Sequence, residues 1–231
     1  MKKYALLTFT AICIFMIIPC KGYTFDMTIG ATTWYAWYSQ EDEEETIKPD
    51  PIFFYGPALS VKINDDFNLT FVYLYGRFNY SNAGFDFKMK RIDSDLALNY
   101  KLNEYFKVFG GIKYIGYSAD VLFFSTKIYL FGPGLGLSAT YPIVGDLFLL
   151  ANLSGIYLWG YSEVVGFTGK EKLEYNTYGI NSSLSLAYYI APASTVISLG
   201  GRYQCLMSND DSNNRTKFYG ITLSATYSFS I

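Results

Sequence analysis

The last thirteen residues of the chain, YGITLSATYSFSI at positions 219–231, alternate without a break between apolar side chains and small or polar ones. Tyrosine, isoleucine, leucine, alanine and phenylalanine occupy the odd positions, while glycine, threonine and serine occupy the even ones. Because successive side chains of a β-strand point to opposite faces, this period of two indicates a strand with one apolar face and one polar face. Residues 25–37 alternate in the same way. Both ends of the chain are therefore predicted to be strands of the same kind.

The sequence between these two ends contains eight further stretches of strand-like alternation. They are 52–63, 67–79, 88–100, 105–117, 127–141, 147–159, 177–190 and 195–206. Tight turns alternate with longer polar connections, and the predicted total of ten strands is even. These features are typical of an all-β transmembrane antiparallel up-and-down β-barrel with both termini on the periplasmic side. The alternation is weaker in 67–79 and 147–159, so eight or twelve strands remain as alternatives.

The composition of the two faces indicates which one points outward. The chain is 51% hydrophobic and only 16% charged. A soluble barrel directs its large apolar residues inward, whereas a membrane barrel directs them toward lipid. The opposite face carries mainly glycine, serine, threonine and asparagine, which are too small and too polar to fill a hydrophobic core. We therefore expect the apolar face to contact lipid. Pro57 and Pro133 fall within predicted strands, and we expect a β-bulge at each.

Residues 1–22 have the pattern of a cleavable signal peptide. Two lysines precede an apolar run over residues 4–18, which is too short to span a bilayer comfortably. Cleavage is expected after Gly22, which leaves 23–231 as a single outer-membrane β-barrel domain. The alternative is a lipoprotein signal in which Cys20 is acylated, although the proline before this cysteine fits such a signal poorly.

Aromatic residues recur at matched positions near the strand ends. In four strands a tyrosine or phenylalanine precedes a glycine, and tyrosines recur near the opposite end of the predicted strands. Aromatic side chains are enriched where a membrane protein crosses the two membrane interfaces. We expect an outer girdle of Tyr55, Phe131, Tyr178 and Tyr219, and a periplasmic girdle of Tyr100, Tyr141, Tyr188 and Tyr227.

The final residues Tyr-Ser-Phe-Ser-Ile, at 227–231, are similar to the assembly signal of bacterial outer-membrane proteins. With the ladder of alternating strands, they make the chain resemble the small outer-membrane β-barrels that include OmpW, OmpX and the membrane domain of OmpA. Ile231 departs from the usual terminal phenylalanine. The resemblance implies insertion by the outer-membrane assembly machinery and contact with outer-membrane lipid and lipopolysaccharide or its equivalent. It also implies a role in permeation, adhesion or envelope integrity.

The chain contains no histidine. Histidine is the commonest general base and metal ligand, so most hydrolase triads and zinc sites are excluded. The enzymes among outer-membrane barrels that resemble this chain in size each rely on a catalytic histidine. We therefore expect no enzyme, no catalytic residues, no metal and no cofactor. We also expect no nucleic-acid partner, because basic and aromatic residues are not arranged for one.

Charged residues on the polar face are candidates for function, because this face lines the predicted lumen. A turn centred on Asn103 would place Asp93 opposite Lys113, and Lys107 opposite Asn99. Charges from other strands could join them across the lumen. The candidate set is Lys62, Arg91, Asp93, Asp95, Lys107, Lys113 and Arg202.

Two interpretations of these charges are open. They form either a salt-bridged plug, which we favour, or the selectivity constriction of a narrow pore. The sequence thus predicts a small porin-like channel or an envelope structural protein with a salt-bridged lumen. The alternative is a surface adhesion or ligand-binding protein that acts through its extracellular loops, with the barrel as an anchor.

Overall fold

A computed structural model describes seven parts of the chain. They are residues 26–41, 46–47, 50–82, 85–121, 124–166, 169–208 and 215–230. The predicted signal peptide, the cleavage site after Gly22 and the alternative lipid site at Cys20 lie outside the described residues. No helix among the described residues is long and apolar enough to cross a membrane.

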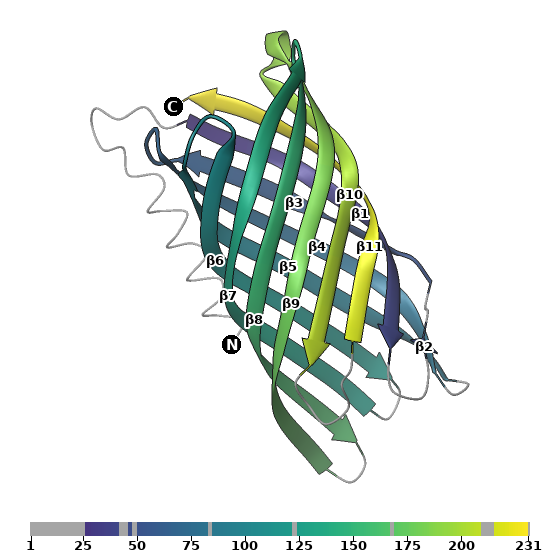
Figure 1. The fold of residues 1–231 in the computed structure, drawn as a ribbon. Helices are drawn as coiled ribbons and strands as arrows, with labels where there is room; N and C mark the ends of the chain where they lie inside the picture. The colour runs from purple at the N-terminus through teal and green to yellow at the C-terminus, as the bar shows by residue number, and fades with distance from the viewer. Residues whose placement is uncertain are drawn as a thin grey trace.

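The described chain folds into a closed antiparallel β-barrel (Figure 1). Its elements are β1 (Asp26–Glu41), β2 (Thr46–Ile47), β3 (Ile52–Lys62), β4 (Phe67–Asn82), β5 (Phe85–Lys101), β6 (Phe106–Val121), β7 (Phe124–Val144), β8 (Leu147–Gly166), β9 (Gly169–Ile190), the 3₁₀ turn η1 (Ala191–Ala193), β10 (Thr195–Ser208) and β11 (Arg215–Ser230). The two-residue β2 pairs only with β1, and β11 pairs with β1 to close the sheet. The prediction of ten barrel strands is therefore confirmed.

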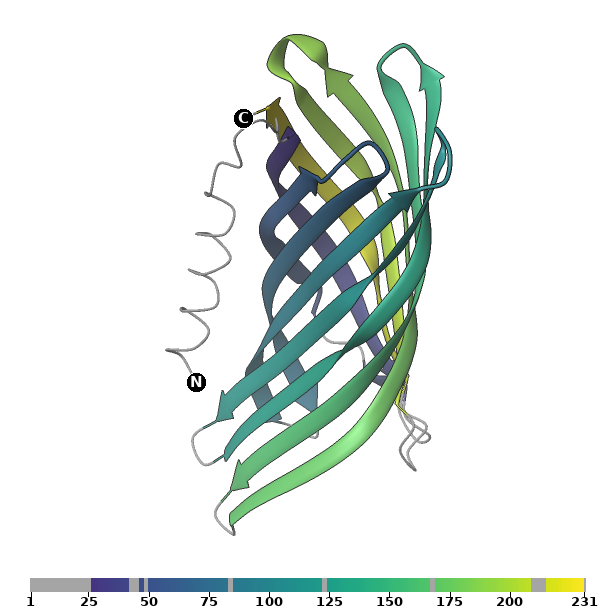
Figure 2. The same cartoon turned by 90° about the vertical axis from the view of Figure 1, so that its left-hand side faces the viewer.

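The two terminal strands that first indicated the fold form the seam of the barrel. β1 and β11 pair in one continuous register from Asp26 opposite Ser230 to Glu41 opposite Arg215. Their matched alternation places both apolar sets on the outside, because a shift of one residue would reverse every side chain. We call the end of the barrel where β1 starts and β11 finishes the terminal end. We call the opposite end, which carries the β8–β9 hairpin, the loop end (Figure 2).

The connections at the loop end are shorter than the alternation predicted. Residues 161–176 were expected to form a loop, but most of them continue β8 and β9 as a paired ribbon up to Gly166 and Gly169. The same correction applies to 118–126, where β6 and β7 stay paired up to Val121 and Phe124. A hairpin that projects beyond the barrel has water on both faces, so its side chains do not need to alternate between apolar and polar. Its two strands can still pair through their backbones.

Neither proline forms the predicted bulge. Around Pro57, the pairing of β3 with β4 resumes in the same register after a two-residue gap. The pairing of β7 with β8 does the same around Pro133. Each proline faces outward and leaves the ladder locally unpaired on one side, because it has no N–H to donate. The register shift between these strands lies instead between Pro142 and Val144, next to a turn.

The outer surface carries the apolar side chains, as predicted. Exposed residues include Ile29, Leu135, Leu153, Leu184, Leu199 and Leu223. All eight predicted girdle residues, Tyr55, Phe131, Tyr178, Tyr219, Tyr100, Tyr141, Tyr188 and Tyr227, are also exposed. Tyr178 and Tyr188 are ten residues apart in β9. At about 3.3 Å per residue and a tilt of about 45° they span roughly 23 Å, which matches the apolar band of a membrane barrel.

The interior contradicts the expectation that its side chains are too small and polar to form a core. The half of the lumen near the loop end is filled by large apolar residues that are at most 1% exposed: Trp34, Phe54, Leu74, Ile115, Leu158 and Phe218. The two weakly alternating segments, β4 and β8, contribute Leu74 and Leu158 to this core. Their alternation was weak because apolar residues occupy both faces there. The half near the terminal end is lined by serine, threonine and asparagine, as expected.

Glycine allows the strands to approach closely at Gly132, where a Cβ atom would lie 2.1 Å from the carbonyl oxygen of Tyr157. We expect Gly132→Ala to lower the free energy of unfolding by about 1–3 kcal/mol, because the backbone must shift to admit the methyl group. Gly155 on β8 is the matched control, since a Cβ there meets no atom within 4 Å. Gly155→Ala should change stability by less than about 0.5 kcal/mol in urea unfolding followed by tryptophan fluorescence. Equal effects of the two substitutions would contradict the close approach.

Candidate functional site

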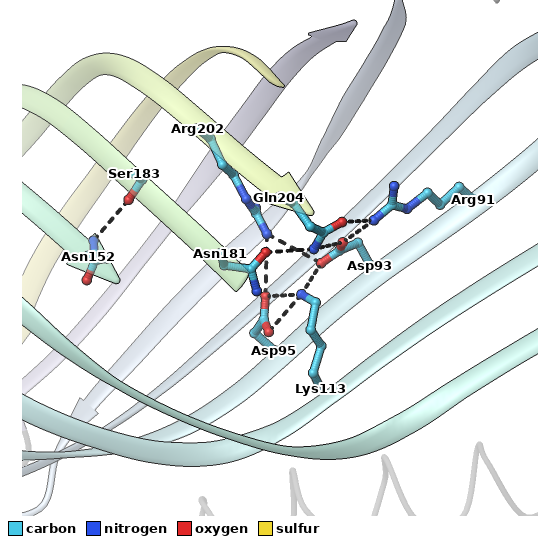
Figure 3. Close-up of polar contacts among 9 residues, drawn as sticks. All are labelled: Arg91, Asp93, Asp95, Lys113, Asn152, Asn181, Ser183, Arg202 and Gln204. Carbon is cyan, nitrogen blue, oxygen red and sulfur yellow. Dashed lines mark hydrogen bonds and ion pairs between the residues drawn. The ribbon is translucent and has the colours of Figure 1, made fainter. Parts of the chain in front are cut away.

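A cluster of ionic and amide side chains crosses the lumen at the boundary between the apolar half and the polar half (Figure 3). Its centre is Asp93 on β5, which is 1% exposed. One carboxylate oxygen, Oδ1, accepts from Lys113 Nζ at 2.7 Å. The other, Oδ2, accepts from Arg91 Nη2 at 2.7 Å and from Gln204 Nε2 at 3.3 Å. A buried carboxylate is tolerated when it is paired in this way.

Arg91 reaches across the barrel from β5 toward β10 and β11. Its Nη2 also donates to Gln204 Oε1 on β10. The guanidinium carbon lies 3.8 Å from the ring centroid of Phe218, 5.2 Å from that of Tyr117 and 5.4 Å from that of Phe54. Arg91 Nε and Nη1 have no hydrogen-bond partner. The three aromatic rings stabilise the cation instead, through cation–π contacts. Arg91 therefore ties the ionic cluster to the apolar core.

The cluster opens toward the polar half of the lumen through Asp95 and Arg202. Lys113 Nζ donates to both oxygens of Asp95 at 2.9 Å. Arg202 Nη2 lies 3.6 Å from Asp93 and 3.7 Å from Asp95. The Arg202 guanidinium also stacks on Trp34, at 4.6 Å from the ring centroid. The neighbouring strands β5 and β6 are thus joined through the lumen to β10, which lies more than one hundred residues from β5 in the sequence.

The predicted pairing of β5 with β6 was wrong by two residues. Lys113 is directly opposite Asp95, and Asp93 is opposite Ile115. The shift arises in the turn, where Asn103 Oδ1 accepts from the backbone N–H groups of Tyr105 and Phe106. A shift of two keeps every side chain on its face. Lys113 therefore still reaches Asp93, but as a diagonal neighbour.

Two of the predicted lumen charges lie outside this cluster. Lys62 is at the terminal end, with Nζ 2.7 Å from Asp65 and 3.7 Å from Asp26. The hydrogen bond from Lys62 lowers the pKa of Asp65 in the exposed turn. Lys107 lies opposite Lys101 rather than Asn99, and it lines the mouth of the barrel at the same end. Lys62 and Lys107 therefore lie at the terminal end of the lumen, away from the ionic cluster around Asp93.

Two amide side chains of the cluster were missed by sequence reasoning. Gln204 is fully buried, and its Nε2 donates to Asn181 Oδ1 at 2.8 Å. Both residues lie on the inward positions of their strands, so a search for all polar inward residues would have found them. Only the fold shows that they face Arg91 and Asp93 from the far wall.

A cavity of about 390 Å³ lies directly beneath the cluster, toward the terminal end. Half of its lining residues carry hydroxyl or amide groups, including Asn152, Ser154, Ser183 and Ser224, and its charged lining residues are Asp95, Lys113 and Arg202 from the cluster. A second cavity of about 420 Å³ lies at the mouth, between Asp26, Lys62 and Lys107. The polar half of the lumen is thus a well that ends at the ionic cluster.

Three solved structures are similar to this chain. The translocator domain of autotransporter NalP from Neisseria meningitidis aligns with 11% identity and a TM-score of 0.53, covering 98% of this chain and 96% of that one. The neisserial surface protein NspA aligns with 15% identity and a TM-score of 0.41, covering 88% and 97%. The attachment invasion locus protein Ail of Yersinia pestis aligns with 14% identity and a TM-score of 0.36, covering 87% and 98%.

The comparison with NalP shows that the fold is that of a small bacterial outer-membrane β-barrel. No protein-family model and no curated protein sequence matches the chain.

Proposed function

We propose that this chain, which has the fold of a bacterial outer-membrane β-barrel, works in the outer membrane as a closed envelope protein with a salt-bridged lumen. In this proposal the signal peptide is removed after Gly22, the apolar outer surface contacts lipid and lipopolysaccharide or its equivalent, and the eight aromatic girdle residues lie at the two membrane interfaces. The role is non-catalytic, in keeping with a chain that contains no histidine.

The observation that carries this proposal is the obstruction of the lumen. Arg91, Asp93 and Lys113 are each at most 1% exposed, and the large apolar residues next to them are equally buried. An ion crossing the barrel would have to separate buried ion pairs and displace packed side chains. Separating buried charges from their partners costs several kcal/mol. These contacts favour a plug over a selectivity constriction.

We expect the folded wild-type protein to give no conductance steps in planar lipid bilayers. The physical reason is that packed and buried side chains, such as Trp34, Phe54 and Phe218, occupy the apolar half of the lumen among the described residues. A preparation should first be shown to be folded by heat-modifiable mobility on a gel. Asp66→Asn, in the exposed turn at the terminal end, is the control for Asp93→Asn. Reproducible ion-selective steps of the wild type that change with Asp93→Asn, but not with Asp66→Asn, would instead establish a porin-like channel.

A second candidate is adhesion or ligand binding through the loop end. The β8–β9 hairpin extends beyond β10, since the pairing of β10 with β9 ends at Ser208 opposite Thr177. Charges line this extension: Lys170 Nζ lies 2.8 Å from Glu163, and Lys172 lies over the ring of Tyr161. Attachment of cells that display the chain, measured with and without residues 163–172, separates this function from a purely structural one.

A further inference from the structure

The charges at the closed end of the well do not balance. Arg91, Lys113 and Arg202 supply three positive charges, while Asp93 and Asp95 supply two negative ones. We propose that this end of the well binds a small oxyanion, the phosphate or carboxylate group of a solute, with Arg202 and Ser183 as the principal donors. The inference rests on the closed lumen of the proposed function and adds a ligand class to it.

Charge is the first support. An unbalanced positive charge away from bulk water is unfavourable, and a bound anion would neutralise it. Arg91 is neutralised by Asp93 at 2.7 Å, and Lys113 by both carboxylates at 2.7 and 2.9 Å. Arg202 is therefore the cation whose charge is least matched by a close partner. It is also the most exposed of the three cations, at 15% against 0% for Arg91 and 1% for Lys113.

Donor geometry is the second support. The ion pairs of Arg202 with Asp93 and Asp95 measure 3.6 and 3.7 Å. Charge-assisted hydrogen bonds are shorter, at about 2.7–2.9 Å. The guanidinium thus keeps donor capacity for a further acceptor, and its planar fork suits an oxyanion.

Ser183 provides a second donor on the neighbouring strand. Ser183 on β9 pairs directly with Arg202 on β10, so the two side chains are neighbours on the lumen face. Ser183 Oγ accepts from Asn152 Nδ2 at 3.2 Å, which leaves its own proton to donate elsewhere. Ser183, Asn152 and Arg202 all line the 390 Å³ cavity, and Figure 3 shows the contact between Ser183 and Asn152.

The carboxylate of Asp95 is the group that opposes an anion here, because it lines the same cavity. The Asp95 side chain is 37% exposed, but both of its oxygens accept from Lys113 at 2.9 Å, so this cation offsets its charge. Asp93 is fully enclosed behind it. The lining residues other than Asp95, Lys113 and Arg202 are uncharged, and they include serine, threonine and asparagine side chains that can donate hydrogen bonds.

The test measures binding of inorganic phosphate and of acetate to the folded full chain in non-ionic detergent, by calorimetry at constant chloride. We expect saturable binding of at least one of these probes to the wild type. Arg202→Gln should weaken it by about tenfold or more, because a hydrogen bond to a charged group is lost. Ser183→Ala should weaken it by a smaller factor and is the milder variant if Arg202→Gln fails to fold.

Lys90→Gln is the matched control, because it removes one positive charge from the outer surface rather than from the lumen. Its affinity should stay within about twofold of the wild type, since an exposed charge is screened by salt. Absence of saturable binding of both probes to the folded wild type would overturn the proposal. So would affinities of the folded Arg202→Gln and Ser183→Ala variants equal to that of the wild type. Neither result depends on conductance, so failure of this site is distinguishable from failure of the closed-barrel proposal.

Discussion

Asp93→Asn is expected to lower the free energy of unfolding by about 3–5 kcal/mol, the usual cost of removing one partner from a buried ionic group. The carboxylate of Asp93 accepts from Arg91 and Lys113 at 2.7 Å and lies 3.6 Å from Arg202. An asparagine would keep the shape but leave three cations with the single carboxylate of Asp95. Urea unfolding of the detergent-solubilised barrel, followed by tryptophan fluorescence, measures the change.

Asp66→Asn provides the comparison for this measurement. Asp66 is exposed in the turn between β3 and β4, so its substitution should change stability by less than about 0.5 kcal/mol. Adding Lys113→Met to Asp93→Asn should recover part of the loss, because it removes one of the unmatched buried cations. Similar stabilities of the Asp93→Asn and Asp66→Asn variants would show that the central cluster contributes little to the fold.

Leu223→Arg is expected to cost about 2–4 kcal/mol, because it places a charge on the lipid face near the middle of the membrane. Leu223 is 50% exposed on the outside of β11, where it pairs with Thr33 and Leu199. In water an exposed leucine would tolerate this change with little effect. The measurement is the free energy of unfolding of the barrel reconstituted in lipid vesicles.

Thr226→Arg is the matched variant on the same strand. Thr226 points into the polar cavity of the lumen, where a long charged side chain can reach water. Its substitution should cost less than about 1 kcal/mol, since lumen positions tolerate charge better than lipid-facing ones. If the two arginines were equally tolerated in lipid, the assignment of the outer face to the membrane would be wrong.

The sequence predicted the strands of the barrel wall more accurately than the packing of the side chains inside the barrel. Strand number and facing follow from a period of two within the individual strands, as in the sequence at positions 219–231. Strand pairing was less accurate, because the Asn103 turn shifted the partner of Lys113 from Asp93 to Asp95. The apolar core was missed because inward leucines such as Leu74 and Leu158 were interpreted only as interruptions of the apolar–polar alternation. They are buried interior residues.

The sequence by itself determined that this chain forms an antiparallel barrel with an apolar outside, because alternation is a local property of each strand. Only the tertiary structure decided which inward residues meet. Arg91 contacts Gln204 across the lumen, and Arg202 meets Asp93 from the opposite wall, although more than one hundred residues separate the partners in each pair. Lys62 carries the same charge and faces the same lumen, yet it stays at the mouth with Asp65. Contacts across a barrel depend on closure, tilt and depth, which no single strand encodes.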